Sequence, residues 1–182
     1  MFLRRAAFCF FLFATACVHA GDSRWALVDT AANKLSVRDG DDRVIAEYRG
    51  IAFGRGGVAA LHYRGDRTTP RGVFHIVGIR KSRRFKTFYE LDYPTAEHAE
   101  QAFRAGRLDA DSRNAIAQAQ AAGLPPLHGT ALGGEIGIHG IGRGDPKIHR
   151  RFNWTTGCVA LTNAQLQDFD SYAFPGMRVE IR

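Results

Sequence analysis

The chain has little cysteine, and most of it lies outside the part that is expected to fold. Three cysteines occur in 182 residues, and two of them, Cys9 and Cys17, fall within the first twenty positions. Cys158 is then left without a partner for an intramolecular disulfide. A disulfide scaffold is therefore excluded, and the lone thiol needs another explanation, of which nucleophilic catalysis is one.

Long apolar runs, repeats and low-complexity linkers are also missing from residues 21–182. No segment there approaches the roughly 20 apolar residues that a membrane-spanning helix needs. Nothing divides this part of the chain, so residues 21–182 are predicted to form one domain around one core. No pair of histidines has zinc-type spacing with a cysteine or carboxylate partner, and no metal is expected.

The N-terminal segment has the pattern of a secretory signal peptide. Two arginines precede the apolar stretch 6–18, and Val18-His19-Ala20 is an acceptable cleavage site. Residues 1–20 are therefore predicted to be removed after Ala20, and the protein to be exported to the periplasm or cell wall. An uncleaved anchor helix and a lipoprotein attached through Cys17 are the alternatives.

Basic residues outnumber acidic ones. The full chain has 25 Lys and Arg against 18 Asp and Glu, and loss of the two N-terminal arginines would leave a net charge of +5. A basic exported protein suits an anionic partner such as a cell-wall polymer or a membrane surface. No nucleic-acid-binding module is recognisable, so nucleic acid is not expected as a partner.

The hydrophobic pattern predicts a mostly β domain of mixed α+β class. Two capped helical patterns, at 95–105 and 109–122, end at Gly106 and Gly123 and form a small helical insertion. Thr162 and Gln165 have the spacing of a capping box, which predicts a third helix. Alternating or β-branched runs predict strands at 25–28, 34–38, 43–53, 73–77, 85–93, 135–139 and 177–182.

Cys158 and His139 are the candidate reactive pair. A thiol attacks a carbonyl as the thiolate, and a free thiol has a pKa of about 8.5, so a nearby imidazole is a useful base. Glycines beside both residues, Gly140 and Gly157, allow backbone to approach a substrate. The N–H groups around Gly157 are candidate donors to an oxyanion. From spacing alone, a buried small hydrophobe and a structural histidine remain the alternative.

The motif around these residues resembles a known family. His139, fifteen residues and then Thr155-Thr156-Gly157-Cys158 is similar to the pattern of the L,D-transpeptidase catalytic domain family (YkuD type). That pattern is a histidine, fourteen to seventeen residues, and Ser/Thr-His-Gly-Cys. Other segments are similar to further family runs, and extend the resemblance over residues 24–182: 65–74, 91–94, 132–140 and Asn163.

The resemblance implies a β-sandwich domain and a cysteine acyltransferase that needs no cofactor. Cys158 matches the nucleophile, His139 the histidine that deprotonates it, and Gly157 a residue of the oxyanion loop. The implied substrates are peptidoglycan stem peptides, cleaved between the L-centre of diaminopimelate and the terminal D-Ala. An amine from a second stem peptide or a wall-attached protein would then resolve the thioester.

Two residues depart from the family pattern. Thr156 stands where the commonest pattern has a second histidine, which is assigned to substrate positioning and the oxyanion region. Ala160 stands in place of a frequent arginine. Both changes leave the nucleophile and base intact, but Thr156 leaves the acceptor open. An L,D-carboxypeptidase or hydrolase that uses water is one alternative, and a non-catalytic wall-binding module is another.

Basic side chains near the motif are candidate contacts for substrate carboxylates. Arg143 and Arg151 lie in the segment that joins His139 to Cys158 and are expected to meet substrate in preference to Arg83 or Arg84. A solvated basic face is the alternative. The other histidines are interpreted as surface or structural residues: His62, His75, His98, His128 and His149.

Overall fold

A computed structural model describes residues 23–182. The predicted signal peptide, its cleavage after Ala20 and the Cys17 alternative lie outside the described residues. The helices are α1 (Ala96–Arg104), α2 (Ala110–Ala121), α3 (Pro146–Arg151) and α4 (Asn163–Phe169). The strands are β1 (Trp25–Asp29), β2 (Lys34–Arg38), β3 (Val44–Arg49), β4 (Val58–Ala59), β5 (Thr69–Pro70), β6 (Gly72–Ser82), β7 (Lys86–Leu91), β8 (Gly137–Gly140), β9 (Val159–Leu161) and β10 (Arg178–Ile181).

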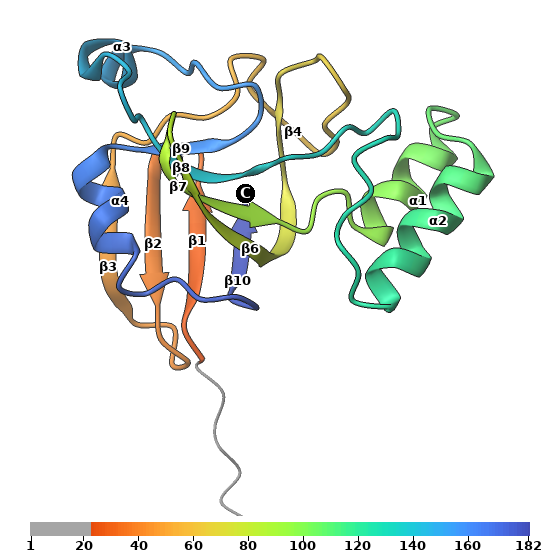
Figure 1. Cartoon of the computed structure of the whole chain (residues 1–182), viewed down its shortest axis with the longest axis horizontal. Coiled ribbons are helices and arrows are strands. Elements are labelled where there is room, and N and C mark those ends of the chain that lie inside the picture. The colour runs from red at the N-terminus through yellow and green to blue at the C-terminus, as the bar shows by residue number, and fades with distance from the viewer. Residues whose placement is uncertain (1–22) are drawn as a thin grey trace, which may run out of the picture.

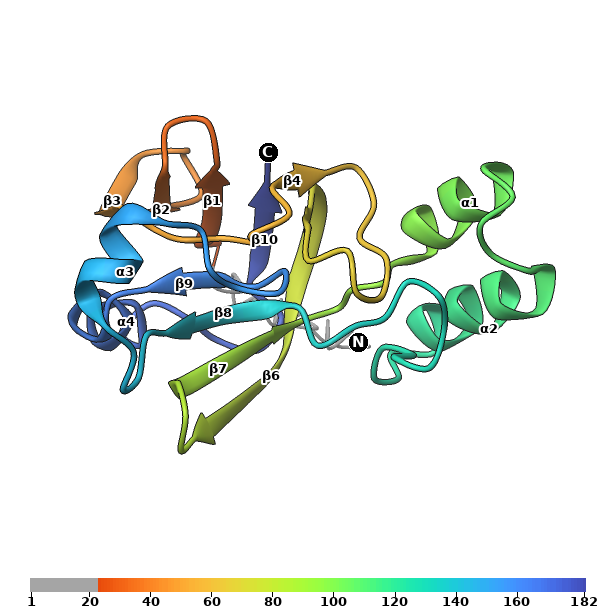
Figure 2. The ribbon, with the colours of Figure 1, turned by 90° about the horizontal axis from the view of Figure 1, so that it is seen from above.

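Eight of these strands form one sheet in the order β3-β2-β1-β10-β6-β7-β8-β9 (Figure 1). The first part of β6, Gly72–His75, pairs with β10, and its later part, Ile76–Ser82, pairs with β7. The register shifts between Ile76 and Gly78, and such a bulge bends a strand and increases its twist. One strand therefore belongs to both halves of the sheet, which lie on either side of it (Figure 2).

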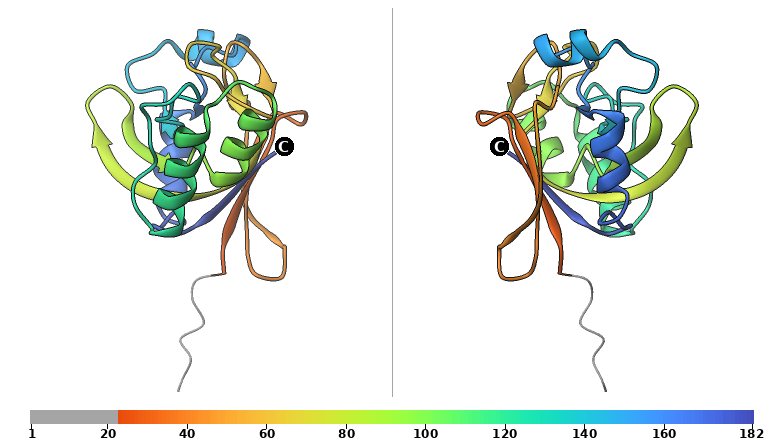
Figure 3. Two further views of the ribbon diagram at one scale, coloured as in Figure 1. Left: turned by 90° about the vertical axis from the view of Figure 1, so that its right-hand side faces the viewer. Right: turned by 90° about the vertical axis from the view of Figure 1, so that its left-hand side faces the viewer.

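The two halves face each other as a sandwich. Figure 3 shows β6 as the long curved strand that turns from one half into the other. Ala52, which follows β3, exchanges two backbone hydrogen bonds with Ala160 of β9, at 3.0 and 2.6 Å. This bridge joins the chain beyond one edge strand to the strand at the opposite edge. The predicted mostly β domain with small helices is confirmed.

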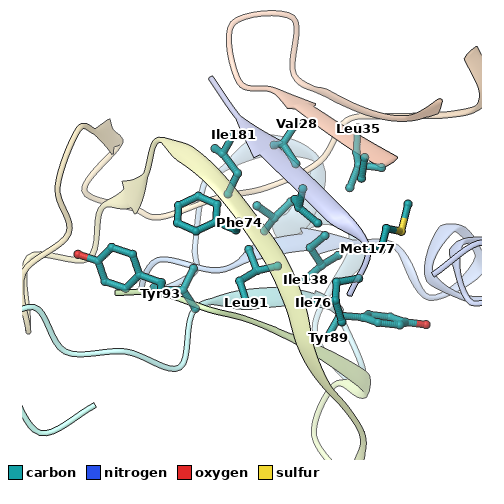
Figure 4. Packing of buried hydrophobic residues seen from close by; sticks show 14 of the residues in the cluster. Val28, Leu35, Phe74, Ile76, Tyr89, Leu91, Tyr93, Ile138, Met177 and Ile181 are labelled. Atoms are coloured by element: carbon teal, nitrogen blue, oxygen red, sulfur yellow. The ribbon is translucent and has the colours of Figure 1, made fainter. Parts of the chain in front are cut away.

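Apolar side chains from both halves fill the space between them (Figure 4). Phe74 and Leu91 are fully buried there, together with Ile138 of β8. In β10 the buried residues are Val179 and Ile181, which alternate with half-buried ones as the two-residue period of a strand requires. The core thus lies directly behind β8, the strand that carries His139.

The predicted helical insertion is confirmed. Thr95 and Asp109 cap α1 and α2 through their side-chain oxygens, and the pair lies between β7 and β8 in the chain, at one side of the molecule (Figure 1). The capping box of Thr162 and Gln165 is complete at the start of α4. Among residues 23–182, no helix combines the length and apolar character needed to cross a bilayer.

The structure differs from the local predictions in three places. The strand predicted over 43–53 ends at Arg49, because Gly50 turns the chain with a φ of +69°. Thr69–Pro70, for which no strand was predicted, pairs in parallel with β4. Helix α3 was not predicted, although Asp145 caps it and proline occupies its first turn. Its six residues are too few to display a helical period.

Replacement of Ile76 by alanine tests the importance of the shared strand. Ile76 is 1% exposed and its neighbour Val77 is 46% exposed. Ile76→Ala is expected to lower the free energy of unfolding by about 2–5 kcal/mol, because it leaves a cavity in the core. Val77→Ala, on the solvent face of the same strand, is expected to cost less than about 1 kcal/mol. Urea denaturation of both variants measures the difference, and equal losses would contradict this account.

Candidate active site

Parallel pairing of β8 with β9 places Cys158 and His139 on one face of the sheet. His139 is in register with Ala160, and Cys158 precedes Ala160 by two residues. Side chains two apart on a strand point to the same face, as do residues in register on neighbouring strands. Both side chains line one cavity of about 410 Å³, called the thiol cavity below. The structure therefore brings the predicted pair together.

Aromatic rings enclose His139, which is 2% exposed. Its ring centroid lies 4.2 Å from that of Phe85, 6.1 Å from that of Phe88 and 5.8 Å from that of Trp154. Burial lowers the pKa of His139 to about 4, and the backbone carbonyl of Gly140 offsets only part of that effect. The imidazole is therefore neutral at pH 7 and able to accept a proton.

The tautomer of His139 follows from its hydrogen bond. Nδ1 lies 2.8 Å from the carbonyl oxygen of Gly140. A carbonyl oxygen only accepts, so Nδ1 carries the hydrogen and Nε2 of the neutral ring carries the lone pair. A base needs this arrangement, because one nitrogen anchors the ring and the other stays free for proton transfer.

The thiol of Cys158 rests in its protonated form. Its side chain donates to the carbonyl oxygen of Glu135 at a Sγ–O distance of 3.3 Å. Burial raises the pKa of Cys158 to about 12, and the Glu135 carboxylate adds to this effect. The backbone N–H of Gly137 and the charge of Arg80 act in the opposite direction. The site therefore holds a neutral thiol and a neutral imidazole, and proton transfer must accompany attack.

The loop before Cys158 is closed by Thr155. Its hydroxyl donates to the carbonyl oxygen of Cys158 at 2.6 Å and accepts from the N–H of Gly157 at 3.2 Å. Gly157 has a φ of +141°, and a Cβ atom there would lie 2.7 Å from Cδ1 of Ile136 and 2.9 Å from the carbonyl oxygen of Thr68. Glycine is therefore required at 157 both by conformation and by space. Its oxyanion role stays a prediction.

Gly140 has a packing reason that the sequence did not reveal. A Cβ atom there would lie 2.8 Å from Oδ1 of Asn163 and 3.1 Å from Cδ2 of Leu166. Asn163 in turn accepts from the N–H of Gly142 and donates to its carbonyl oxygen, both at 2.8 Å. Glycine at 140 lets helix α4 pack closely against β8. That Gly140 also lets the backbone approach a substrate stays a prediction.

The hairpin between β6 and β7 reaches over the site. The carbonyl oxygen of Phe85 accepts from the N–H of Gly140 at 3.1 Å, so the tip of the hairpin is held against the end of β8. Arg84 at that tip lines both the thiol cavity and a neighbouring cavity of about 550 Å³. Arg80 lines the thiol cavity as well. Sequence reasoning missed Arg80 and ranked Arg84 below Arg143 and Arg151, because the fold of a hairpin back onto a distant strand leaves no local signal.

The ranking of arginines from sequence was therefore wrong in two respects. Arg143 lines the neighbouring cavity with Arg83 and Arg84, so it has no advantage over them. Arg151 is exposed at the end of α3 and lines neither cavity. Substrate contact through Arg151 therefore has no geometric support.

Thr156 is exposed at a boundary between two cavities. It lines the thiol cavity and, with Glu135, a further cavity of about 390 Å³, called the second cavity below.

His98 is structural as predicted, since its ring lies 2.6 Å from Oγ1 of Thr95 and 2.9 Å from the carbonyl oxygen of Arg71. In the described part of the chain, no three His, Cys, Asp or Glu side chains gather as metal ligands would.

Comparison with known proteins agrees with this geometry. The L,D-transpeptidase catalytic domain family, YkuD, matches residues 23–181. No curated protein matches the chain. Among solved structures, Bd1075 of Bdellovibrio bacteriovorus is similar with a TM-score of 0.57 and 17% identity, over 88% of this chain and 48% of that one.

Two L,D-transpeptidases are also similar in structure. For that of Xylanimonas cellulosilytica the TM-score is 0.51 at 16% identity, over 90% of this chain and 62% of that one. For that of Enterococcus faecium, a cysteine-to-serine variant, the TM-score is 0.51 at 11% identity, over 88% of this chain and 50% of that one. These identities establish a shared fold alone. The chain spans less than two thirds of each of these solved chains.

The protonation state of Cys158 predicts how its alkylation depends on pH. With a thiol pKa of about 12, the thiolate fraction rises about tenfold per pH unit throughout the neutral and mildly alkaline range. In His139→Gln, where no imidazole assists the attack, the rate of reaction with iodoacetamide, followed by intact mass, is expected to rise accordingly between about pH 7 and about pH 10. Any alkylation that remains in Cys158→Ala comes from other thiols and is subtracted. A rate that is constant across this range would indicate a resting thiolate and contradict the account.

Replacement of Gly157 by alanine tests the loop. The added methyl group meets Ile136 and the backbone of Thr68, so Gly157→Ala is expected to destabilise the protein by about 1–3 kcal/mol and to abolish turnover. Gly129→Ala is the control, because no atom lies within 4 Å of a Cβ there. Thermal unfolding measures stability. A Gly157 variant as stable as the control would show that the loop tolerates the side chain.

Proposed function

Because the chain belongs to the L,D-transpeptidase catalytic domain family, we propose that it is an exported cysteine acyltransferase acting on peptidoglycan stem peptides. One observation carries the proposal. Cys158 and His139 line the same cavity, and the hydrogen bond from His139 to Gly140 leaves Nε2 free to accept the thiol proton. A wall-binding module has no need of a buried thiol facing an oriented imidazole.

The first half-reaction follows from the two neutral groups. Sγ of Cys158 attacks the carbonyl carbon at the L-centre of diaminopimelate while its proton moves to Nε2 of His139. The tetrahedral intermediate collapses, the C–N bond breaks, and the imidazolium gives its proton to the leaving D-Ala amine. A thioester on Cys158 and a neutral His139 remain. Because the thiol proton moves only during attack, the resting site does not have to hold a buried thiolate–imidazolium ion pair.

Arginines at the rim of the thiol cavity favour an anionic donor. Arg80 lies over the ring of Phe88 at 4.3 Å, and Arg84 lies over the ring of Phe85 at 4.9 Å. Stacking on aromatic rings orients a guanidinium and leaves its edge available to carboxylates. Stem peptides carry such carboxylates. Glu135 is the acidic side chain of this lining, so positive charge predominates there.

The second half-reaction decides the outcome. Attack of an amine on the thioester would give a 3–3 cross-link or attach a protein, whereas attack of water would make the protein an L,D-carboxypeptidase or hydrolase. Thr156 is exposed beside the thioester position and lines both cavities. We favour the amine, and water is the alternative that the experiment below separates.

Defined substrates test the proposed function. The purified protein is incubated with disaccharide tetrapeptides, with and without an amine acceptor, and the products are followed by mass spectrometry. Cross-linked dimer is the expected product. Tripeptide alone would support the hydrolase, and unchanged substrate with retained wall binding would exclude the enzyme. An acyl adduct on the wild type should be missing from Cys158→Ala.

Replacement of His139 by glutamine tests the base. His139→Gln is expected to reduce kcat/KM by about 10²–10⁴-fold, because it removes the proton acceptor. His75→Gln is the matched control, since His75 is exposed on β6 and lies 3.3 Å from Asp92, away from the cavity. A His139 variant that keeps the activity of the His75 variant would show that another group takes the thiol proton.

A further inference from the structure

A second imidazole lies on the other side of Thr156 from His139. His62 lines the second cavity, whose wall of Thr156 and Glu135 is shared with the thiol cavity. The remaining lining is Arg64, Gly65, Arg67, His128, Gly133 and Gly134. His62 is 5% exposed, so it is nearly as buried as His139, which is 2% exposed.

The orientation of His62 matches that of His139. Nδ1 of His62 lies 2.8 Å from Oδ1 of Asp66 and 2.8 Å from the carbonyl oxygen of Thr68. Both oxygens are acceptors, so Nδ1 carries the hydrogen and Nε2 of the neutral ring carries the lone pair. Among residues 23–182 no group is hydrogen-bonded to Nε2. This nitrogen is free to accept a proton, as it is in His139.

Hydrogen bonds hold both the Asp66 carboxylate and the backbone of His62 in place. Asp66 accepts from the N–H groups of Tyr63 and Thr68, at 2.7 and 2.8 Å, so its carboxylate is itself held in place. The N–H of His62 donates to the hydroxyl of Tyr93 at 3.1 Å. A carboxylate that orients an imidazole through Nδ1 also stabilises the imidazolium formed when Nε2 takes a proton. Such a pair is built for base catalysis.

Two glycines bring this imidazole against the nucleophile loop. A Cβ atom on Gly157 would lie 3.4 Å from Cε1 of His62, and one on Gly133 would lie 3.6 Å from its Nε2. The ring edge that carries the free nitrogen therefore faces the residue next to Cys158. The absence of side chains at both positions keeps that edge uncovered.

We propose that His62 is the general base of the second half-reaction, with Asp66 as its positioning partner. The inference rests on the proposed function. The acceptor enters through the second cavity and attacks the thioester carbonyl carbon while its N–H or O–H proton moves to Nε2 of His62. The tetrahedral intermediate collapses, the C–S bond breaks and its electron pair returns to Sγ. The imidazolium then gives this proton, through solvent in the second cavity, to the thiolate, which restores a neutral His62 and the Cys158 thiol.

Two bases on opposite sides of Thr156 separate the two substrates. His139 acts on the donor in the thiol cavity, and the released D-Ala leaves from that cavity. His62 acts on the acceptor in the second cavity. The acceptor can therefore bind there without displacing any part of the donor. An amine or water that attacks a thioester must lose a proton as its new bond forms, and a positioned base accelerates such a step by about 10²–10⁴-fold.

Replacement of His62 by asparagine isolates this step. The side-chain N–H₂ of asparagine can donate to the carbonyl oxygen of Thr68 as Nδ1 does, but nothing replaces Nε2. The probe is p-nitrophenyl acetate, a small activated ester whose reaction with Cys158 does not depend on stem-peptide recognition. His62→Asn is expected to acetylate at the wild-type rate and to deacylate about 10²-fold more slowly, with and without added glycinamide. Acetyl-enzyme then accumulates, as intact mass measures.

Two further variants complete the test. His75→Asn removes the other imidazole that lies beside an aspartate, on the outer face of β6, and should deacylate normally. His62→Gln also lacks a base and should match His62→Asn; normal acetylation in either variant demonstrates a folded site. Wild-type deacylation in both His62 variants would overturn the inference, as would failure of the ester to acetylate Cys158. Normal ester turnover with inert tetrapeptides would overturn the stem-peptide proposal alone.

Discussion

The parallel pairing of two short strands, β8 and β9, governs the site. It fixes His139 opposite Ala160 and so places Cys158 on the same face. The rest of the molecule maintains this register. The long strand β6 positions β7 and through it β8, the bridge from Ala52 holds β9 from its other side, and glycine at 140 lets α4 press against both.

Close approach of backbone recurs around this pair. A Cβ atom on Gly137 would lie 2.4 Å from the carbonyl oxygen of Tyr89, so β7 leaves no space for a side chain at that point of β8. The N–H of Gly137 also favours the thiolate form of Cys158. A single residue therefore combines tight packing of the sheet with polar support for the nucleophile. Mobility that loosened the sheet would weaken both.

Local signals in the sequence specified part of this structure. Capping residues predicted α1, α2 and α4, because each capping residue lies within a few positions of the helix end that it stabilises. Cys158 and His139 were identified from one motif, and the structure places both in the lining of one cavity. Phe85 was missed and Arg84 was ranked too low, because their positions depend on a hairpin that folds onto β8. His62 was interpreted as a surface or structural residue, since its approach to Gly157 arises only in three dimensions.

Strand order also has a consequence for how the chain folds. β10 lies between β1 and β6, so the pairing that joins these two strands into one sheet requires residues 178–181. Formation of the complete sheet must therefore wait for these residues, and contacts this distant in sequence form slowly. Until then β1 and β6 expose unpaired edges that invite association with other chains. A helper that shields those edges in the nascent chain would raise the yield of folded protein without contact with the candidate site.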